Sequence, residues 1–148
     1  MPTPPTDLAA AYDDALERFN GDNFSDLDDV DKVLVTIWGL EADVNNGGFD
    51  QYYFNSSGNQ AVWAPAALRM IGAAQAADIV ERANAVFGPE GPLPDRDARQ
   101  DRLFQVAPRD DADDGLGPWD DLDDEFYGYP DDISELMQLF LRTRGRLA

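Results

Sequence analysis

Residues 30–55 read VDKVLVTIWGLEADVNNGGFDQYYFN, and this stretch decides the fold. Apolar side chains recur in it every three or four residues, which is the spacing of one buried face of an α-helix. The spacing predicts a helix over residues 27–45, which the pair Gly47-Gly48 ends because glycine favours helix termination. One or two further helical turns are expected over residues 49–55. The stretch therefore predicts two consecutive helices with a break at the glycines.

The same helical spacing recurs along the rest of the chain, and no segment shows the alternation that is typical of strands. We therefore expect an all-α fold, a bundle of about six to eight helices in a single domain over residues 1–148. The expected helices cover residues 7–20, 27–45, 49–55, 66–71, 73–87, 95–106, 119–127 and a last segment from residue 133, where Asp132 and Glu135 have capping-box spacing. The expected core residues are Ile37, Trp38, Phe49, Phe54, Ile79, Phe87, Phe126 and Phe140.

The composition excludes several classes of chemistry. The chain has no cysteine and no histidine, which excludes disulfides, thiolate and imidazole metal ligands, and a serine–histidine–aspartate triad. The single lysine, Lys32, does not follow a glycine-rich loop, so no P-loop for nucleotide phosphates is present. We expect no cofactor.

The location expected from the sequence is cytoplasmic. Residues 1–6 contain neither the basic nor the apolar part of a signal peptide, and no apolar run approaches the ~18–20 residues that cross a bilayer. With 30 acidic and 11 basic residues the net charge is −19. Direct nucleic-acid binding and adsorption to anionic membranes are therefore not expected, because both depend on lysine and arginine.

The negative charge is concentrated in two blocks. Residues 7–31 carry a net charge of −8 and residues 110–132 carry −11, whereas residues 32–109 carry only −2. A helix with an acidic residue at every second position presents a charge about every 3 Å, close to the ~3.4 Å between charges along one DNA strand. This density favours a surface that replaces DNA on a basic protein. The candidate partner-binding residues are Asp26, Asp28, Asp29, Asp110, Asp111, Asp113, Asp114, Asp120, Asp121, Asp123, Asp124 and Glu125.

Other roles of the acidic residues have weaker support. Residues 110–121 partly match a calcium-binding EF-hand loop, but Ala112 stands at a ligand position and Asp121 replaces the bidentate glutamate, so no metal site is expected. With 30 acidic residues, carboxylate pairs like those of glycosidases arise by chance. Acidity that only serves solubility, or that reflects the composition of the whole proteome, is the alternative.

A polar cluster surrounds the glycine pair. Glu41 lies on the apolar stripe three residues after Trp38, so its carboxylate should be partly buried and need hydrogen-bond donors. The amides of Asn45, Gln51 and Asn55 are the expected donors. A glutamate without a nucleophile, metal or second positioned acid is a poor catalyst, which favours a structural role over an enzyme that uses Glu41. The expected structural residues are Glu41, Asn45, Asn46, Gly47, Gly48, Phe49, Gln51 and Asn55.

The run VNNGGFDQYYFNSSG at residues 44–58 resembles the signature of the DMP-type DNA-mimic family of bacterial proteins. The stretches 67–73, 76–87, 122–127 and 136–141 are similar to the same family, so the resemblance covers roughly residues 27–142. It implies an all-helical fold and an acidic surface that occupies the DNA-binding face of a protein partner.

The sequence thus predicts a non-enzymatic acidic protein that occludes a basic, DNA-binding surface of a partner protein, as a monomer or as a homodimer. The alternative is a helical interaction module, for example an immunity protein, whose acidity serves only solubility. A third hypothesis is an enzyme that uses Glu41.

Overall fold

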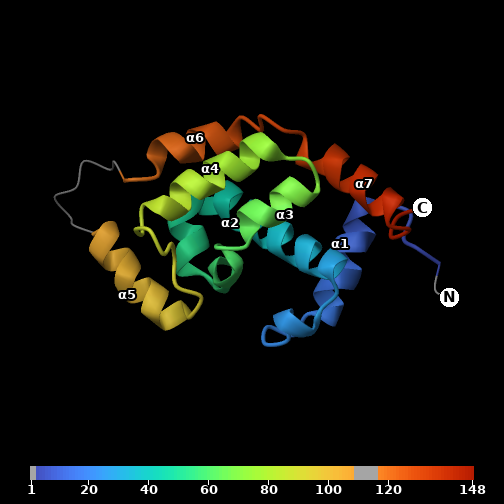
Figure 1. The fold of residues 1–148 in the computed structure, drawn as a ribbon, viewed down its shortest axis with the longest axis horizontal. Coiled ribbons are helices and arrows are strands. Elements are labelled where there is room, and N and C mark those ends of the chain that lie inside the picture. Colours follow the sequence, from blue (N-terminus) through green and yellow to red (C-terminus); the bar gives the residue numbers. More distant parts are fainter. Residues whose placement is uncertain (1–2, 109–116) are drawn as a thin grey trace.

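The computed structural model describes residues 3–108 and 117–148, and over these ranges it contains helices and no strand (Figure 1). This confirms the all-α prediction. The described helices are α1 (Leu8–Arg18), α2 (Asp29–Phe54), α3 (Ala64–Met70), α4 (Ala74–Ala85), α5 (Arg96–Val106), α6 (Asp120–Tyr127) and α7 (Ile133–Thr143), with the short 3₁₀ helices η1 (Phe24–Asp26) and η2 (Ser56–Gln60). Each predicted helix is present with boundaries shifted by a few residues, since helix ends fray.

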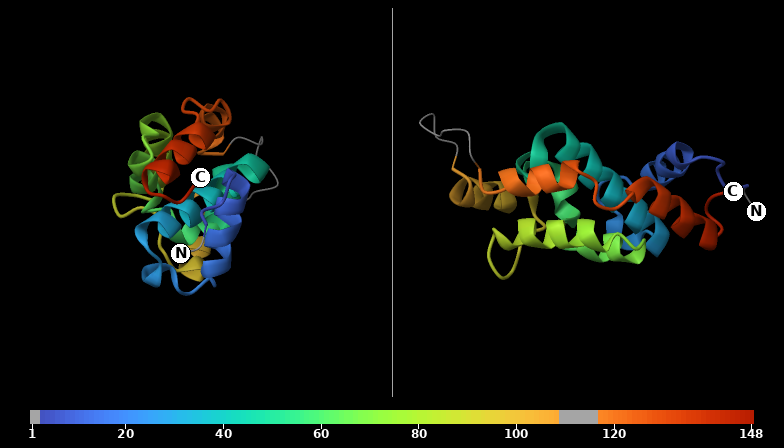
Figure 2. Two further views of the ribbon diagram at one scale, coloured as in Figure 1. Left: turned by 90° about the vertical axis from the view of Figure 1, so that its right-hand side faces the viewer. Right: turned by 90° about the horizontal axis from the view of Figure 1, so that it is seen from above.

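Helix α2 runs through the middle of the fold. It packs against α1, α3, α5, α6 and η2. Helix α4 packs against both α3 and α6, and α7 contacts α1. Figure 2 shows that the helices form an elongated body with both chain ends at the same end of the long axis. Because helices surround α2 on most sides, consecutive residues such as Val33, Leu34, Val35, Thr36 and Ile37 are all buried.

An aromatic cluster fills the core around the second half of α2. The ring of Tyr53 lies 4.7 Å from that of Phe87 and 5.0 Å from that of Trp119, measured between centroids. Phe49 lies 5.9 Å from Phe126 in an edge-to-face arrangement. Such pairs contribute about 0.5–1.5 kcal/mol beyond the area that they bury. The cluster therefore packs α6 and the residues that follow α4 against α2.

Most of the predicted core is confirmed. Ile37, Phe49, Ile79, Phe87, Phe126 and Phe140 are buried. Phe54 is only partly buried. The prediction was wrong for Trp38, whose side chain is 44% exposed. Trp38 lies about 100° around the helix from Ile37, on the side of α2 that also carries the exposed Ala42 and Asn45.

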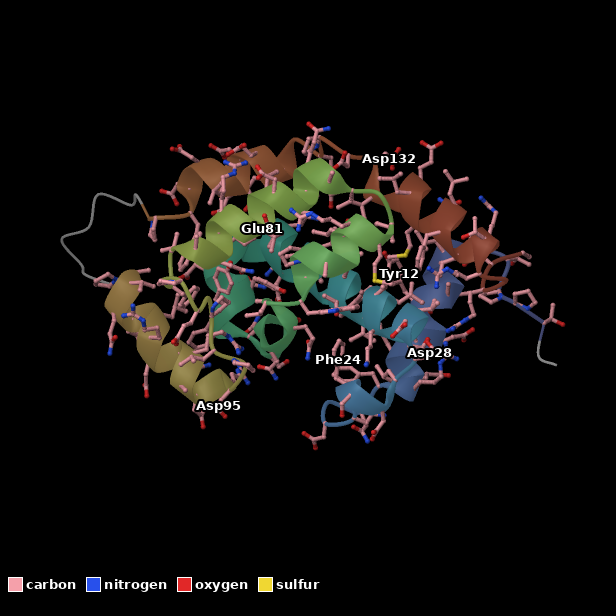
Figure 3. The ribbon with its side chains drawn as sticks, in the orientation of Figure 1. Tyr12, Phe24, Asp28, Glu81, Asp95 and Asp132 are labelled. Carbon is pink, nitrogen blue, oxygen red and sulfur yellow. The ribbon has the colours of Figure 1, made fainter. Side chains whose placement is uncertain are left out.

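Several aspartates begin helices. Asp7, Asp28, Asp95 and Asp132 each accept a hydrogen bond from the backbone N–H three residues later, at 2.8–3.1 Å, and Figure 3 labels the last three. The bond from the Glu135 N–H confirms the predicted cap at Asp132. A cap of this kind stabilises a helix by about 1 kcal/mol. Part of the acidity of the chain therefore has a structural cause.

Candidate functional site

The glycine pair breaks α2 at the predicted place. Gly47 and Gly48 have non-helical backbone angles, and Gly48 has φ +77° and ψ −176°, a conformation that is essentially limited to glycine. A Cβ atom on Gly48 would lie 2.5 Å from Oδ2 of Asp123 in α6. Glycine is therefore required here both by the backbone conformation and by the close approach of a carboxylate.

The carboxylate of Asp123 binds the backbone at this break. Its Oδ1 accepts a hydrogen bond of 2.8 Å from the backbone N–H of Phe49, the first residue after the glycines. Burial raises the pKa of Asp123 to about 6; the Phe49 N–H opposes this rise, and the nearby Asp120 and Asp124 carboxylates add to it. Asp123, which the sequence assigned to the partner-binding surface, therefore points at the helix break and is not a freely exposed charge.

Asp43 is the centre of a polar network that spans the break. Its Oδ1 accepts hydrogen bonds from the amides of Gln51 at 2.9 Å and Asn55 at 3.0 Å. The amide of Asn46 in turn donates to Oε1 of Gln51 at 2.9 Å. Asp43 was not among the predicted site residues, and the amides of Gln51 and Asn55 were assigned to Glu41. Gln51 and Asn55, four residues apart after the break, lie on one helix face, but the break at Gly47 and Gly48 separates them from Asp43, so helical spacing gave no signal for this partner.

Glu41 has a different partner. The hydroxyl of Tyr129 donates to Oε2 of Glu41 at 2.7 Å, and the amide of Asn45 donates to the Tyr129 oxygen at 2.7 Å. Of the three expected amides, Asn45 thus reaches Glu41 only through Tyr129, and Gln51 and Asn55 do not reach it. Burial raises the pKa of Glu41, although the hydrogen bond from Tyr129 opposes that shift.

The acidic residues of α6 divide into paired and exposed groups. Glu125 forms a two-bond ion pair with Arg82 of α4, with both distances 2.8 Å. Asp120 is partly buried and accepts the N–H of Gly117 at 2.7 Å. Asp121 and Asp124 are exposed. The exposed negative charge of α6 is thus centred on Asp121 and Asp124.

The first acidic block is also partly engaged. Asp28, besides capping α2, lies 3.1 Å from Arg146. Asp31 is buried and binds both Arg18 and Arg146; burial opposes ionisation, but these arginines lower its pKa. Asp26 and Asp29 are exposed. Asp31 was not among the predicted site residues, although a carboxylate inside an apolar stripe needs such partners.

Helix α6 and the described part of the first block lie in different halves of the long axis, whereas Asp132, at the end of the second block, lies in the same half as α1 (Figure 3). In Figure 1, α6 follows the upper edge in one half, whereas α1 lies in the other half, and the view from above in Figure 2 agrees. Asp28, labelled in Figure 3, lies in the same half as α1. A partner that covered both blocks would therefore have to extend along the molecule.

Four of the predicted surface residues lie outside the described part of the chain: Asp110, Asp111, Asp113 and Asp114. Most of the EF-hand-like pattern over residues 110–121 lies outside it as well. Within residues 3–108 and 117–148, no three acidic side chains meet in a way that could hold a metal ion. No helix in these two ranges combines the length and the apolar character that crossing a membrane requires.

A comparison with protein-family models matches the model of the DMP19-like proteins over residues 25–144. The chain belongs to the DMP19-like protein family. The region shared with the DMP19-like proteins runs from η1 to α7 and includes the glycine break, Asp123 and the second acidic block. Helix α1 lies outside it. Neither the curated proteins nor the solved structures gave a match.

Proposed function

We propose that this DMP19-like protein is a non-enzymatic binding protein whose acidic surface takes the place of DNA on a basic, DNA-binding protein. The observation that carries the proposal is the exposure of Asp121 and Asp124 on α6, inside a block of net charge −11 that contains no basic residue. Membership of a family of DNA mimics supports the same function.

The spacing of the exposed carboxylates suits this role. Asp121 and Asp124 are three residues apart on α6, which corresponds to about 4.5 Å along the helix axis. Asp13 and Glu17, both exposed on α1, are four residues apart, or about 6 Å. These intervals are of the same order as the ~3.4 Å between charges along one DNA strand. Basic side chains that a DNA-binding protein uses to contact successive phosphates are therefore spaced to contact these carboxylates instead.

The total charge adds a long-range effect. A net charge of −19 attracts a basic protein before contact, so we expect fast association that slows as salt screens the field. Salt dependence alone does not separate mimicry from general attraction, because any basic protein would respond to it.

The test is capture followed by competition. The full chain is immobilised, a cell extract of its source organism is passed over it at low salt, and retained proteins are challenged with duplex DNA. We expect duplex DNA to displace the retained protein, because both occupy one surface. Retention that duplex DNA leaves unchanged would contradict mimicry.

A pair of matched variants locates the surface. Asp121→Asn/Asp124→Asn should slow association with the retained protein about tenfold, since it removes two charges from the contact. Asp97→Asn/Asp101→Asn removes the same charge from exposed positions of α5 in the nearly neutral segment, and should change the rate much less. Equal effects of the two pairs would assign binding to total charge rather than to α6.

A helical interaction module whose acidity serves only solubility is the second candidate. It is favoured by the internal use of several carboxylates, such as Glu125 with Arg82 and Asp28 with Arg146. It predicts that the Asp121→Asn/Asp124→Asn variant binds any retained protein as before and only aggregates more readily.

A further inference from the structure

A hollow of about 440 Å³ opens between α1 and α2, on the side of α2 that carries Trp38. Tyr12 and Asp13 of α1 line one side of it, and Trp38, Glu41 and Asn45 of α2 line the other. Figure 3 labels Tyr12. No arginine or lysine contributes to this lining within the described part of the chain. The hollow is therefore negatively charged and partly aromatic.

Two polar groups in the hollow have unused hydrogen-bonding capacity. The hydroxyl oxygen of Tyr12 is buried and has no hydrogen-bond partner among the described residues. Glu41 accepts the hydrogen bond of Tyr129 at Oε2, and a carboxylate has about four acceptor positions. A buried hydroxyl without a partner is unfavourable by about 1–3 kcal/mol.

The exposure of Trp38 is the second feature that indicates a ligand. A tryptophan that is 44% exposed leaves a large aromatic face in water beside the Glu41 carboxylate. Aromatic faces attract cations, and tryptophan is the side chain that does so best. A carboxylate and an aromatic face that line the same hollow are together complementary to a positively charged planar group.

The position of the hollow connects it with the acidic surface. Its α1 side belongs to the first acidic block, which includes Asp13. On its α2 side, Glu41 and Asn45 contact Tyr129, which lies two residues after the end of α6. The hollow thus lies between the two regions of exposed negative charge, where a basic partner would pass over it.

We propose that this hollow is the anchoring site for one arginine side chain of the basic partner. The inference rests on the proposed function and names the contact that would give it specificity. An arginine guanidinium is planar, stacks on aromatic rings and presents five N–H donors, which suits Trp38, Glu41 and Tyr12 together. A lysine ammonium is compact and more strongly hydrated, so it gains less from the same site. Buried arginine anchors of this kind dominate the energy of many protein interfaces.

The test uses a defined probe in place of the unidentified partner. The ¹⁵N-labelled full chain is titrated with N-acetyl-arginine amide at low salt, and backbone and indole N–H signals are followed by NMR. We expect saturable shifts confined to the indole of Trp38 and the backbone around Tyr12 and Glu41, with a dissociation constant in the millimolar range, as befits one side chain. N-acetyl-citrulline amide, which has the same shape without the charge, should cause no such shifts.

Three variants connect the signal to the hollow. Glu41→Gln keeps an acceptor for Tyr129 but removes the charge, and should weaken probe binding at least tenfold. Trp38→Ala removes an exposed ring and should abolish the saturable shifts while leaving the fold intact. Asp121→Asn/Asp124→Asn is the control, because it removes two charges outside the hollow and should change probe affinity less than twofold.

Three outcomes would overturn the inference: shifts that spread along α6 without saturating, an unchanged affinity in Glu41→Gln, or an equal affinity when Nα-acetyl-lysine amide replaces the arginine probe. The two proposals fail separately. If the probe does not bind but duplex DNA still displaces a captured protein, only the anchoring site is wrong. If the probe binds as expected but no captured protein is displaced by DNA, the hollow stands as a guanidinium site and the mimic function is wrong.

Discussion

The carboxylate of Asp123 in α6 accepts a hydrogen bond from the backbone N–H of Phe49 in α2, across 74 residues of sequence. This contact supplies a hydrogen-bond acceptor for the N–H of Phe49. Without it that N–H would have no acceptor, because the N–H groups at the start of a helical segment have none within the segment. It also places one carboxylate of the acidic block inside the fold.

The raised pKa of Asp123 predicts a pH dependence of stability. Burial raises it to about 6 in the folded state, whereas the unfolded value is about 3.9. Its contribution to stability is therefore present below about pH 4 and is lost as pH rises through 6. Asp123→Asn keeps the acceptor and removes the charge, so it should be more stable than wild type at pH 7 by about 1–2 kcal/mol, after discounting for partial exposure.

Urea unfolding at pH 4 and pH 7 measures this difference. Asp121→Asn is the control, because it removes a charge from the same helix at an exposed position and should show the wild-type pH dependence. A stability difference between Asp123→Asn and wild type that is the same at both pH values would contradict the assignment.

Gly48→Ala should be strongly destabilising. The new Cβ meets the Asp123 carboxylate and forces a backbone conformation that only glycine tolerates, so we expect a loss of about 3 kcal/mol. Gly145→Ala is the control: φ is +70° there, but no atom lies within 4 Å of the new Cβ, so it should lose only about 1 kcal/mol. Equal losses in chemical denaturation would show that the carboxylate contact is unimportant.

The Glu41–Tyr129 hydrogen bond should be measurable in a double-mutant cycle. Glu41→Ala and Tyr129→Phe should each lower the free energy of unfolding by about 1–2 kcal/mol, because each removes one partner of a shared bond. The double variant should then lose less than the sum of the two, with a coupling of about 1 kcal/mol. Additive losses would mean that the bond contributes nothing to stability.

Arg99→Lys should destabilise the protein although the charge is kept. Arg99 is fully buried and donates to the backbone carbonyls of Tyr53, Leu93, Pro94 and Asn55 at 2.7–3.0 Å. A lysine cannot reach these acceptors in the same fork geometry, so we expect a loss of about 3 kcal/mol.

Arg102→Lys, one helical turn away on α5, is the matched control for that substitution. Arg102 is exposed, and its contact with the Phe87 carbonyl is 3.3 Å long, so the loss should stay below about 1 kcal/mol. Thermal unfolding followed by circular dichroism compares the two variants. A loss at position 99 no greater than at position 102 would refute the structural role of Arg99.

Local patterns predicted the helices well because helical spacing, caps and glycine breaks depend on neighbouring residues. The break at Gly47 and Gly48 and the cap at Asp132 were both predicted in this way. The acceptor for the Phe49 N–H at this break was not predicted, because nothing near Phe49 in the sequence indicates Asp123. Trp38 was misassigned for a related reason. Apolar residues occur around most of α2, so the sequence does not reveal which side other helices leave open.

The candidate surface was predicted only as a set of acidic residues, without knowledge of which carboxylates are exposed. Composition identified the acidic blocks, but it could not separate carboxylates that hold the fold, such as Asp31 and Asp123, from exposed ones such as Asp121 and Asp124. That separation depends on arginines and backbone N–H groups distant in sequence. The match over residues 25–144 confirmed the resemblance on which the family assignment rests.

The close approach of Asp123 to Gly48 also limits how the sequence can change over evolutionary time. A side chain at position 48 is compatible with this fold only if position 123 becomes shorter or moves, so the two sites form one joint constraint. Asp121 and Asp124, two residues before and one residue after Asp123, are exposed and make no such close approach to the glycine break. One short helix thus combines a position that must stay fixed with neighbours that can diverge.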